Sequence, residues 1–467
     1  MKLNQIIYSF RDSYRKLTVP QFTIVTGLII ICVGTILLSS PLCSSSYVGL
    51  WEAFFTATSA ITVTGLTIID IGKDLTILGQ IFLSFMLLSG GLGLMAITTF
   101  LQGFVVKGAK LRTRLDKGNT LDEFGVGGIG GTFKSILITA TIIIFIGAVI
   151  LFFFGFIDIN NYWERAWAAL FHSISAYNNA GFSLWSSSLY NYRSNFVVNV
   201  VFIFLIILGG LGWRVIDDIW DKRNNIRYKK LNLHSRLVIR TSLYLIIFGS
   251  LGFLITESLL NGKFLSDLNF FQRILSAVFE TVNARTAGFT NFPISLNTIS
   301  DTGLLLLMTF MFIGASPGGT GGGIKTTTFI ALMAATRSTL RGQKDVIISN
   351  RLILDKVILK AVGITVGSLL FVLLMAMLLS TTNSFVNKES FTFLEMLFTC
   401  ISAFATVGFD IGLTSKLNHF GQLILIIGMF VGRLGILLLL SAVWEALNKS
   451  RIDRQERIGY PKADLYV

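Results

Sequence analysis

Four times this chain repeats a stretch like Phe398-Thr-Cys-Ile-Ser-Ala-Phe-Ala-Thr-Val-Gly408-Phe409, in which a short apolar segment ends at a glycine and a longer apolar segment follows. The other three copies are Phe55-Thr-Ala-Thr-Ser-Ala-Ile-Thr-Val-Thr-Gly65-Leu66, Phe171-His-Ser-Ile-Ser-Ala-Tyr-Asn-Asn-Ala-Gly181-Phe182 and Val278-Phe-Glu-Thr-Val-Asn-Ala-Arg-Thr-Ala-Gly288-Phe289. The glycines stand 116, 107 and 120 residues apart. Such an internal repeat predicts four equivalent walls around one central hole.

The composition places the chain in a membrane. It has 467 residues, of which 53% are hydrophobic and only 14% charged, against about 25% charged residues in an ordinary soluble domain. Its mean hydropathy is +0.71. Three cysteines and three histidines are scattered along the sequence, so the pattern indicates neither a disulfide framework nor a metal site.

Eight apolar segments are long enough to predict spanning helices, which makes the expected fold all-α. The outer helix of each repeat is expected near 21–40, 135–156, 237–259 and 357–380. The inner helices are expected near 76–101, 195–216, 303–336 and 420–446. Between them lie short apolar segments of about a dozen residues, roughly 18 Å as helix, which is too short for a core of roughly 30 Å. These four segments are therefore predicted to enter and leave the membrane on one side.

The chain accordingly divides into four pore repeats, connectors between them and two terminal segments. The repeats are residues 21–106, 135–216, 237–336 and 357–447; the connectors are 107–134, 217–236 and 337–356, with an arm at 1–20 and a tail at 448–467. Twenty-nine of the 39 Lys and Arg residues lie in or next to the arm, connectors and tail. The positive-inside rule places these segments, and both termini, in the cytoplasm of a multi-pass plasma membrane protein. The dense cluster from Lys222 to Lys230 is either solvated or a docking surface for a cytoplasmic partner, whereas nucleic-acid binding is not indicated.

The four glycine loops suit the passage of a cation. A cation that enters a narrow pore loses its water, and rings of backbone carbonyls replace that water in potassium-selective pores. Glycine adopts the positive φ values that such loops require at little steric cost. The C-terminal ends of four short helices would add partial negative charge near the ion path. The alternative is that these glycines only end buried helices, which is less convincing for four copies in register.

The loops and three further motifs resemble the Trk/Ktr/HKT superfamily of potassium transporters, and within it the KtrB type, the membrane subunit of bacterial Ktr potassium uptake systems. The motifs are Gly90-Gly-Leu-Gly93, Gly314-Ala-Ser-Pro-Gly-Gly-Thr-Gly-Gly-Gly-Ile-Lys325 and Gly432-Arg-Leu-Gly435. The resemblance implies a pseudo-fourfold pore in each protomer, a homodimer in the bacterial inner membrane, and a cytoplasmic KtrA-like nucleotide-binding ring that regulates it. It implies no cofactor in this chain, with K⁺ as the transported ion.

The resemblance also assigns the ion selectivity filter, with potassium held at the four glycines. The filter residues would be Thr64, Gly65, Ala180, Gly181, Ala287, Gly288, Val407 and Gly408. Family members with serine at the first filter glycine tend to pass sodium, so Gly65 favours potassium.

The third inner helix is predicted to break at Gly314 to Ile324, because this segment contains Pro317 and six glycines. The break is either a static kink or a flexible gate beneath the filter, and the family has a gate loop there. The gate residues would be Gly318, Gly319, Thr320, Gly321, Gly322, Gly323, Lys325 and Arg433. Arg433 lies mid-span, where a charge is expected to face the interior of the bundle.

Other charged residues have local interpretations. Arg285, three residues before a filter glycine, is expected to turn away from the ion path and brace the loop. Asp70 and Asp410 either collect cations at the mouth or are ordinary surface carboxylates. Glu52 and Glu395 lie at the start of short helices, where the helix dipole favours a carboxylate; this structural role is favoured over the alternative of ion binding.

Three rival functions are weighed against a channel-like potassium pathway. A sodium- or proton-coupled secondary transporter stays open, although no embedded carboxylate pair is evident. An intramembrane enzyme lacks a nucleophile and base pair beyond His172 and its neighbours. Nucleotide binding is rejected, because Gly125-Val-Gly-Gly-Ile-Gly130 follows no strand and Gly319-Thr-Gly-Gly-Gly-Ile-Lys-Thr326 lacks the glycine before lysine.

Overall fold

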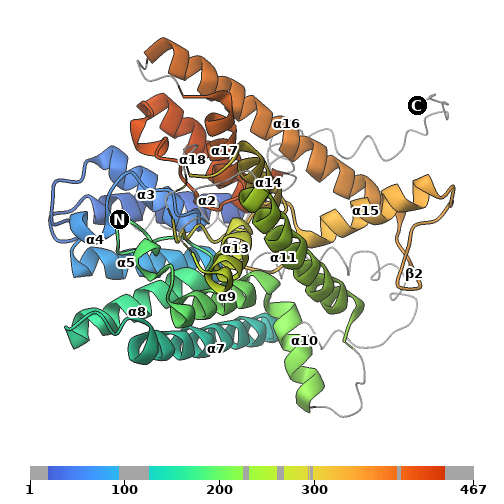
Figure 1. The fold of residues 1–467 in the computed structure, drawn as a ribbon, viewed down its shortest axis with the longest axis horizontal. Helices are drawn as coiled ribbons and strands as arrows, with labels where there is room; N and C mark the ends of the chain where they lie inside the picture. Colours follow the sequence, from blue (N-terminus) through green and yellow to red (C-terminus); the bar gives the residue numbers. More distant parts are fainter. Residues whose placement is uncertain are drawn as a thin grey trace, which may run out of the picture.

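The computed structural model describes residues 19–93, 126–224, 231–259, 268–292, 294, 298–386 and 391–436, and these residues are almost entirely helical (Figure 1). Several predicted segments lie outside the described residues: most of the arm, most of connector 107–134 with Gly125, most of the Lys222 to Lys230 cluster, the end of the fourth inner helix and the whole tail.

Four units follow one another along the chain, each with an outer helix, a short helix, a glycine loop and an inner helix. The outer helices are α2 (Val19–Leu38), α7 (Val126–Ile150, continued by the π-helical η3, Leu151–Gly155), α11 (Leu233–Leu259) and α16 (Asp355–Val386). The short helices, called pore helices below, are α3 (Leu50–Thr62), α8 (Tyr162–Tyr177), α13 (Phe270–Ala284) and α17 (Phe393–Phe404). The inner helices are α5 (Ile77–Leu88, continued by the π-helical η1, Ser89–Gly93), α9 (Phe196–Leu211), α14 (Asp301–Phe312) and α18 (His419–Leu434).

The remaining elements connect these helices. They are α4 (Ile71–Asp74), η4 (Tyr190–Tyr192), α10 (Trp213–Asn224), α15 (Thr326–Leu340), the strands β1 (Ile347–Ile348) and β2 (Arg351–Leu352), and η5 (Thr414–Lys416). The strands form an antiparallel hairpin. Its two turn residues, Ser349 and Asn350, both have positive φ, as a type I′ turn requires.

The units contact one another in a closed circle. Each outer helix packs against the pore helix of its own unit. Each inner helix packs against the pore helix of the next unit, in the pairs α5 with α8, α9 with α13, α14 with α17, and α18 with α3. The last pair joins the fourth unit to the first. In Figure 1 the units run from blue through green and olive to red around the middle of the molecule.

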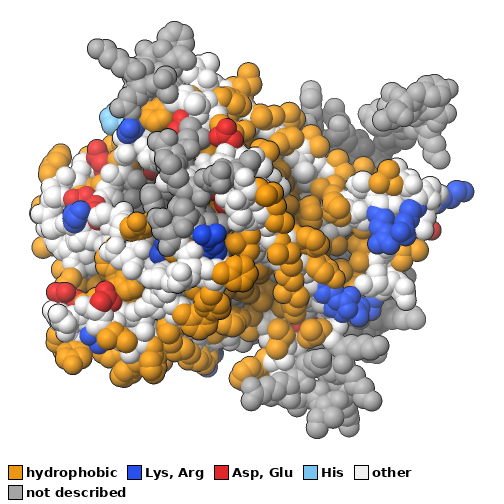
Figure 2. Space-filling view, in the orientation of Figure 1, with side chains coloured by type: hydrophobic (Ala, Val, Ile, Leu, Met, Phe, Trp, Pro, Cys, Tyr) orange, Lys and Arg blue, Asp and Glu red, His pale blue; other side chains and the backbone are white. Residues whose placement is uncertain are grey.

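The outer surface suits a lipid environment. Within the described residues, three helical segments are long and apolar enough to cross a membrane: Lys134–Gly155, Leu233–Leu259 and Asp355–Thr382. A fourth span is possible if the bent pair Phe196–Leu211 and Trp213–Trp220 counts as one. Large apolar side chains face outward on these helices (Figure 2), among them Phe145, Phe248 and Met377. The expected number of eight spans therefore stays a prediction.

The second inner helix differs from its prediction as one helix over 195–216. It ends at Leu211, and α10 leaves at an angle of 96°. Gly212 makes the bend with a φ of 89°, which a residue with a side chain adopts at a cost. The N–H of Trp213 then donates to the carbonyl of Gly318, in the loop that follows α14. The third inner helix is interrupted as predicted, because α14 ends at Phe312 and α15 begins at Thr326.

The inner helices approach the pore helices through glycines. A Cβ atom on Gly90 would collide with the carbonyl oxygen of Ile61, one on Gly209 with that of Tyr177, and one on Gly432 with that of Phe404. Each of these carbonyls lies at or near the C-terminal end of a pore helix. Glycine therefore lets the inner helix support the pore helix at the point where the glycine loop begins.

This contact predicts that two Gly-to-Ala substitutions differ in their effect on thermal stability. Gly209 and Gly363 both lie inside helices, where alanine gains roughly 0.5–1 kcal/mol over glycine. Only Gly209 faces a carbonyl; a Cβ on Gly363 meets nothing within 4 Å. We expect Gly209→Ala to lower the apparent melting temperature of the detergent-purified protein and Gly363→Ala to keep or raise it. Equal shifts for the two variants would contradict the contact.

Candidate functional site

The four glycine loops share one backbone conformation. Each pore helix has a buried C-terminal half. Beyond it, the φ angle is 95° at Gly65, 70° at Gly181, 73° at Gly288 and 93° at Gly408. The residue two positions earlier also has positive φ in every loop, at Val63, Asn179, Thr286 and Thr406. Positive φ is rare for β-branched residues, so its repetition in four loops marks a constrained site.

The four loops form a closed ring at the centre of the circle of units. A Cβ on Gly65 would collide with the carbonyl oxygen of Ala180, one on Gly181 with that of Ala287, one on Gly288 with that of Val407, and one on Gly408 with that of Thr64. Each glycine therefore lies against the residue that precedes the next glycine around the ring. The eight residues predicted for the filter are the ones that the fold brings together here.

The carbonyl groups of this ring have no donor within the described protein. In each loop, the carbonyls of the three residues that end at the glycine accept no hydrogen bond from the described residues. The N–H groups, in contrast, point back to the pore helices: Thr64 donates to Ser59, Ala180 to Ser175 and Val407 to Ser402. Alternation of positive and negative φ turns successive carbonyls toward the same side of the chain. A buried carbonyl is costly without a partner, and these oxygen atoms have the chemistry to ligate a cation.

Side chains of the pore helices fix two of the loops. The Ser59 hydroxyl accepts a hydrogen bond from the Gly65 N–H at 3.0 Å. The Asn283 side chain accepts one from the Phe289 N–H at 3.1 Å. Such bonds hold the N–H groups away from the centre and leave the carbonyls free.

The glycine-rich segment Gly314 to Ile324, called the crossing loop below, lies directly against the ring. A Cβ on Gly321 would collide with the hydroxyl of Thr286, and one on Gly322 with the hydroxyl of Thr406. The loop also pairs with the end of α9, because Ser316 donates to the Gly210 carbonyl and Thr320 to the Gly209 carbonyl. Its residues are largely buried. Glycines therefore occur here because a side chain would not fit, as well as because the backbone must bend.

Two basic side chains fasten the crossing loop. Arg433 donates from Nη1 to the Thr320 carbonyl and from Nη2 to the Gly90 carbonyl, the latter at 2.7 Å. Lys325 Nζ donates to the Gly321 carbonyl at 2.7 Å. Arg433 therefore faces the interior as predicted, and Lys325 contacts the loop rather than extending toward an interface.

One sequence signal for this arrangement was missed. Gly209-Gly-Leu-Gly212 repeats the pattern of Gly90-Gly-Leu-Gly93 and Gly432-Arg-Leu-Gly435. Arg433 therefore occupies the position held by Gly91 and Gly210 in two other units. The fourth unit therefore has a charged side chain where two other units have glycine.

Arg285 turns away from the ring, as expected. Its Nη2 atom lies 3.4 Å from the Ser242 hydroxyl on α11 and 3.5 Å from the Gly314 carbonyl. The residue caps the end of α13, and its side chain lines a small cavity with Ile206 and Ala315. It braces the third loop between an outer helix and the crossing loop.

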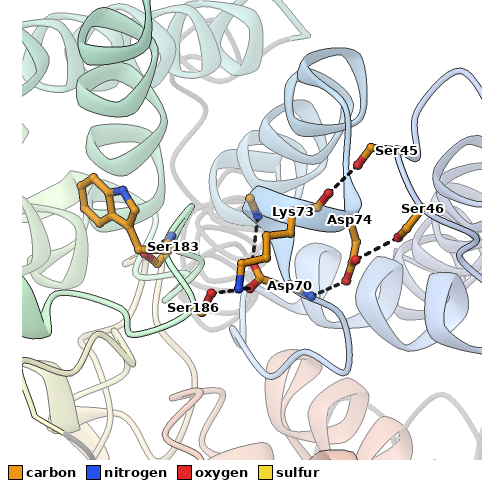
Figure 3. A network of polar contacts seen from close by, with 9 residues as sticks. Ser45, Ser46, Asp70, Lys73, Asp74, Ser183 and Ser186 are labelled. Atoms are coloured by element: carbon orange, nitrogen blue, oxygen red, sulfur yellow. Dashed lines mark hydrogen bonds and ion pairs between the residues drawn. The ribbon is translucent and has the colours of Figure 1, made fainter. Parts of the chain in front are cut away.

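The carboxylates near the mouth have local structural roles. Asp70 caps α4 and accepts a hydrogen bond from Ser186, which joins the first and second units (Figure 3). Partial burial would raise the pKa of Asp70, but the Ser186 hydroxyl and the Lys73 ammonium outweigh it and lower the pKa. Asp410 accepts from the N–H of Leu413 at 3.1 Å, and burial raises the pKa of its carboxyl.

The structural interpretation of Glu395 is confirmed. Its side chain accepts from the Thr392 N–H at 2.8 Å, and the Thr392 side chain accepts from the Glu395 N–H, so the two form a capping box at the start of α17. Glu52 likewise lies in the first turn of α3.

His172 is held by three polar contacts in a buried aromatic cluster. Nδ1 lies 2.8 Å from the Ala168 carbonyl and therefore donates. Nε2 accepts from the Ser183 hydroxyl at 3.1 Å and from the Leu184 N–H at 3.3 Å. The ring stacks on Trp185. Among the described residues, no group of three His, Cys, Asp or Glu residues could hold a metal ion.

The sequence matches the TrkH family, described as cation transport protein, over residues 9–448. It is 33% identical over 452 residues to Ktr system potassium uptake protein B of Bacillus subtilis (strain 168), with 97% of each chain covered. It is also 33% identical over 424 residues to the protein of that name from Vibrio alginolyticus, covering 90% of each chain. It is 33% identical over 456 residues to Potassium/sodium uptake protein NtpJ of Enterococcus hirae, covering 97% of this chain and 98% of the relative.

A solved structure has a similar fold. The crystal structure of the potassium transporter TrkH from Vibrio parahaemolyticus superposes with a TM-score of 0.69 at 18% identity, over 90% of this chain and 83% of that one.

The closed ring predicts that alanine destabilises the protein more at Gly65 than at Gly412, although both glycines have positive φ. Alanine at such a position costs about 1–2 kcal/mol in backbone energy. Gly65 also faces the Ala180 carbonyl, whereas a Cβ on Gly412 meets nothing within 4 Å. Overpacking adds roughly 1–3 kcal/mol, so Gly65→Ala is expected to lower the apparent melting temperature more than Gly412→Ala. Indistinguishable melting temperatures would argue against the ring.

Proposed function

The chain belongs to the TrkH family of cation transport proteins, and on this basis we propose that it takes up potassium across the plasma membrane through the ring of four loops. Three relatives at 33% identity are named for uptake of potassium, or of potassium and sodium. The observation that carries the proposal is the set of carbonyl groups, three in each loop, that accept no hydrogen bond from the described residues.

The ring can replace the water of a monovalent cation. Successive carbonyls on four sides supply oxygen ligands of partial charge, which suits an ion that must also leave again. The pore helices direct their C-terminal ends toward the loops, and each end carries about half a negative charge. The ring itself contains no carboxylate, so it lacks the strong charge that would hold a divalent cation. In this proposal potassium binds at Gly65, Gly181, Gly288 and Gly408.

The four units would then be repeats around one pseudo-fourfold pore. The proposal keeps the repeat boundaries at 21–106, 135–216, 237–336 and 357–447, with eight spans in all. Both termini and the connectors would be cytoplasmic. The Lys and Arg residues that gather near α15 and the β-hairpin fit this side (Figure 2).

The crossing loop, with Arg433 and Lys325, would be the gate beneath the filter. The loop contacts Thr286 and Thr406, which lie two residues before two of the filter glycines. A guanidinium that spans from Thr320 to Gly90 puts a positive charge next to the proposed ion path and opposes a passing cation. Movement of the loop would move this charge and open the path.

We further propose that the chain forms a homodimer and works with a cytoplasmic nucleotide-binding regulatory ring. Two relatives are named as protein B of a Ktr system, a name that implies further components. The hairpin of β1 and β2 offers such a partner exposed apolar side chains at Ile347 and Leu352.

Coupled transport is the second candidate, because one relative is named for uptake of both potassium and sodium. A proton relay has little support among the described residues. The two buried carboxylates of the third unit, Glu257 and Glu280, each accept hydrogen bonds from backbone N–H groups, of Ser300 and Asn291. Potassium uptake that requires sodium would favour coupling, and uptake without it would favour the channel-like pathway.

Gly65→Ser tests the filter. The added side chain meets the Ala180 carbonyl and brings a hydroxyl to the ring. We expect it either to abolish Rb⁺ uptake into proteoliposomes or to reduce discrimination between K⁺ and Na⁺, measured by competition with each ion. Gly412→Ser is the control, since that site is open. Unchanged ion preference in Gly65→Ser, with the control also unchanged, would contradict the filter assignment.

Arg433→Ala tests the barrier below the filter. Loss of the charge and of the two hydrogen bonds that hold the crossing loop is expected to raise the initial rate of Rb⁺ uptake by about tenfold, equivalent to ~1.4 kcal/mol of barrier. Arg341→Ala, which removes an exposed charge at the end of α15, should leave the rate unchanged. A folded Arg433→Ala protein with slower or unaltered uptake would count against a barrier.

A further inference from the structure

Three of the four inner helices carry a buried amide at the same position. Gln80, Asn199 and Gln422 each lie four residues after the residue that caps the helix, namely Thr76, Asn195 and Asn418. Their exposed fractions are 7%, 2% and 4%. Each amide nitrogen donates to backbone carbonyls of the loop that precedes its own helix: Gln80 to Ile71 and Leu75, Asn199 to Tyr192, and Gln422 to Thr414.

The oxygen of each amide accepts a hydrogen bond from the next unit. Gln80 Oε1 accepts from Trp167 Nε1 at 2.7 Å, and Gln422 Oε1 accepts from Trp51 Nε1 at 2.5 Å. Both tryptophans lie in the N-terminal halves of pore helices, fourteen residues before the filter glycine. An indole N–H can only donate, which fixes the orientation of both amides. The amide and its donor join the inner helix of one unit to the pore helix of the next.

The boundary between the second and third units has a variant of the same contact. Ile274 occupies the tryptophan position there, and Asn291 supplies the donor, with Nδ2 3.4 Å from Asn199 Oδ1. Asn291 follows the third filter loop by three residues, and its N–H donates to Glu280 of the pore helix at 3.2 Å. We call these three contacts the amide clasps.

At the boundary between the third and fourth units, apolar side chains occupy both of the equivalent positions. Leu304 lies four residues after the helix cap Ser300 and is 0% exposed, and Leu394 lies fourteen residues before Gly408. Both belong to one apolar cluster, and their helices α14 and α17 pack together. Apolar packing has no preferred direction, whereas a buried hydrogen bond fixes distance and angle. At these two positions the boundary is held by packing that tolerates small shifts, whereas each clasp fixes a distance. The same two units also share the hydrogen bond from Arg433 to Thr320, at the crossing loop.

We propose that Trp51, Trp167 and Asn291 are positioning residues that hold the filter ring at three of its four boundaries, and that the apolar boundary between the third and fourth units is the one that yields during permeation. The crossing loop belongs to the third unit and lies against Thr406 of the fourth. Movement of that loop is therefore transmitted to the one boundary without a clasp. The inference rests on the proposed potassium uptake.

The test compares Rb⁺ uptake by proteoliposomes of the purified full-length chain and its variants, in competition with K⁺ or Na⁺. Trp51→Phe and Trp167→Phe keep the ring but remove the indole donor. Trp163→Phe is the matched control, because Trp163 lies at the start of the same helix as Trp167 and is 86% exposed. We expect both clasp variants to reduce discrimination between K⁺ and Na⁺ by about fivefold, the effect of one buried hydrogen bond, and the control to keep it.

The double variant Leu304→Gln with Leu394→Trp installs a fourth clasp. We expect it to lower the initial uptake rate about fivefold while ion discrimination is kept, and to melt at a higher temperature than additivity of the two single variants predicts.

The outcomes distinguish failure of this inference from failure of the proposed potassium uptake. Wild-type discrimination in both Trp51→Phe and Trp167→Phe, or wild-type uptake by a folded double variant, would overturn this inference. If the double variant does not fold, the two phenylalanine variants still decide the role of the clasps. Absence of Rb⁺ uptake by the unaltered chain would refute the proposed function instead.

Discussion

The structure depends on one constraint: backbone carbonyl groups of the four glycine loops, at the centre of a membrane protein, accept no hydrogen bond from the described residues. Three carbonyls in each of four loops are in this position. The loops have positive φ at Gly65, Gly181, Gly288 and Gly408 and at the residue two positions before each of them. The pore helices hold the N–H groups, the inner helices support the pore helices through glycines, and the outer helices cover the whole with apolar surface.

The four units differ at the features that are expected to control the passage of ions. The third unit has the crossing loop in place of a continuous inner helix, and the fourth has Arg433 where two other units have glycine. These two features meet, since Arg433 donates to Thr320. The same pair of units shares the apolar boundary at Leu304 and Leu394. The crossing loop and the ring of glycine loops thus meet where the third and fourth units adjoin, while buried amide hydrogen bonds join the inner and pore helices at the other three boundaries.

Local patterns in the sequence predicted much of this site, and contacts between distant segments could not be predicted. The glycine repeat located the loops, and Pro317 with its neighbouring glycines located the break in the third inner helix. The bend at Gly212 was missed, because its cause is a hydrogen bond from Trp213 to the crossing loop about a hundred residues away. The bonds of Trp51 and Trp167 to other units were missed for the same reason. An apolar segment shows its length in the sequence but not its partners.

Anomalous diffraction from crystals of the purified chain grown in rubidium salt tests the central claim most directly. Rubidium replaces potassium closely in size and charge, and its position can be identified by its absorption edge. The account predicts rubidium on the axis of the ring, ligated by carbonyl oxygens of residues that end at Gly65, Gly181, Gly288 and Gly408. Rubidium bound elsewhere in the protein, with none at these four loops, would contradict it.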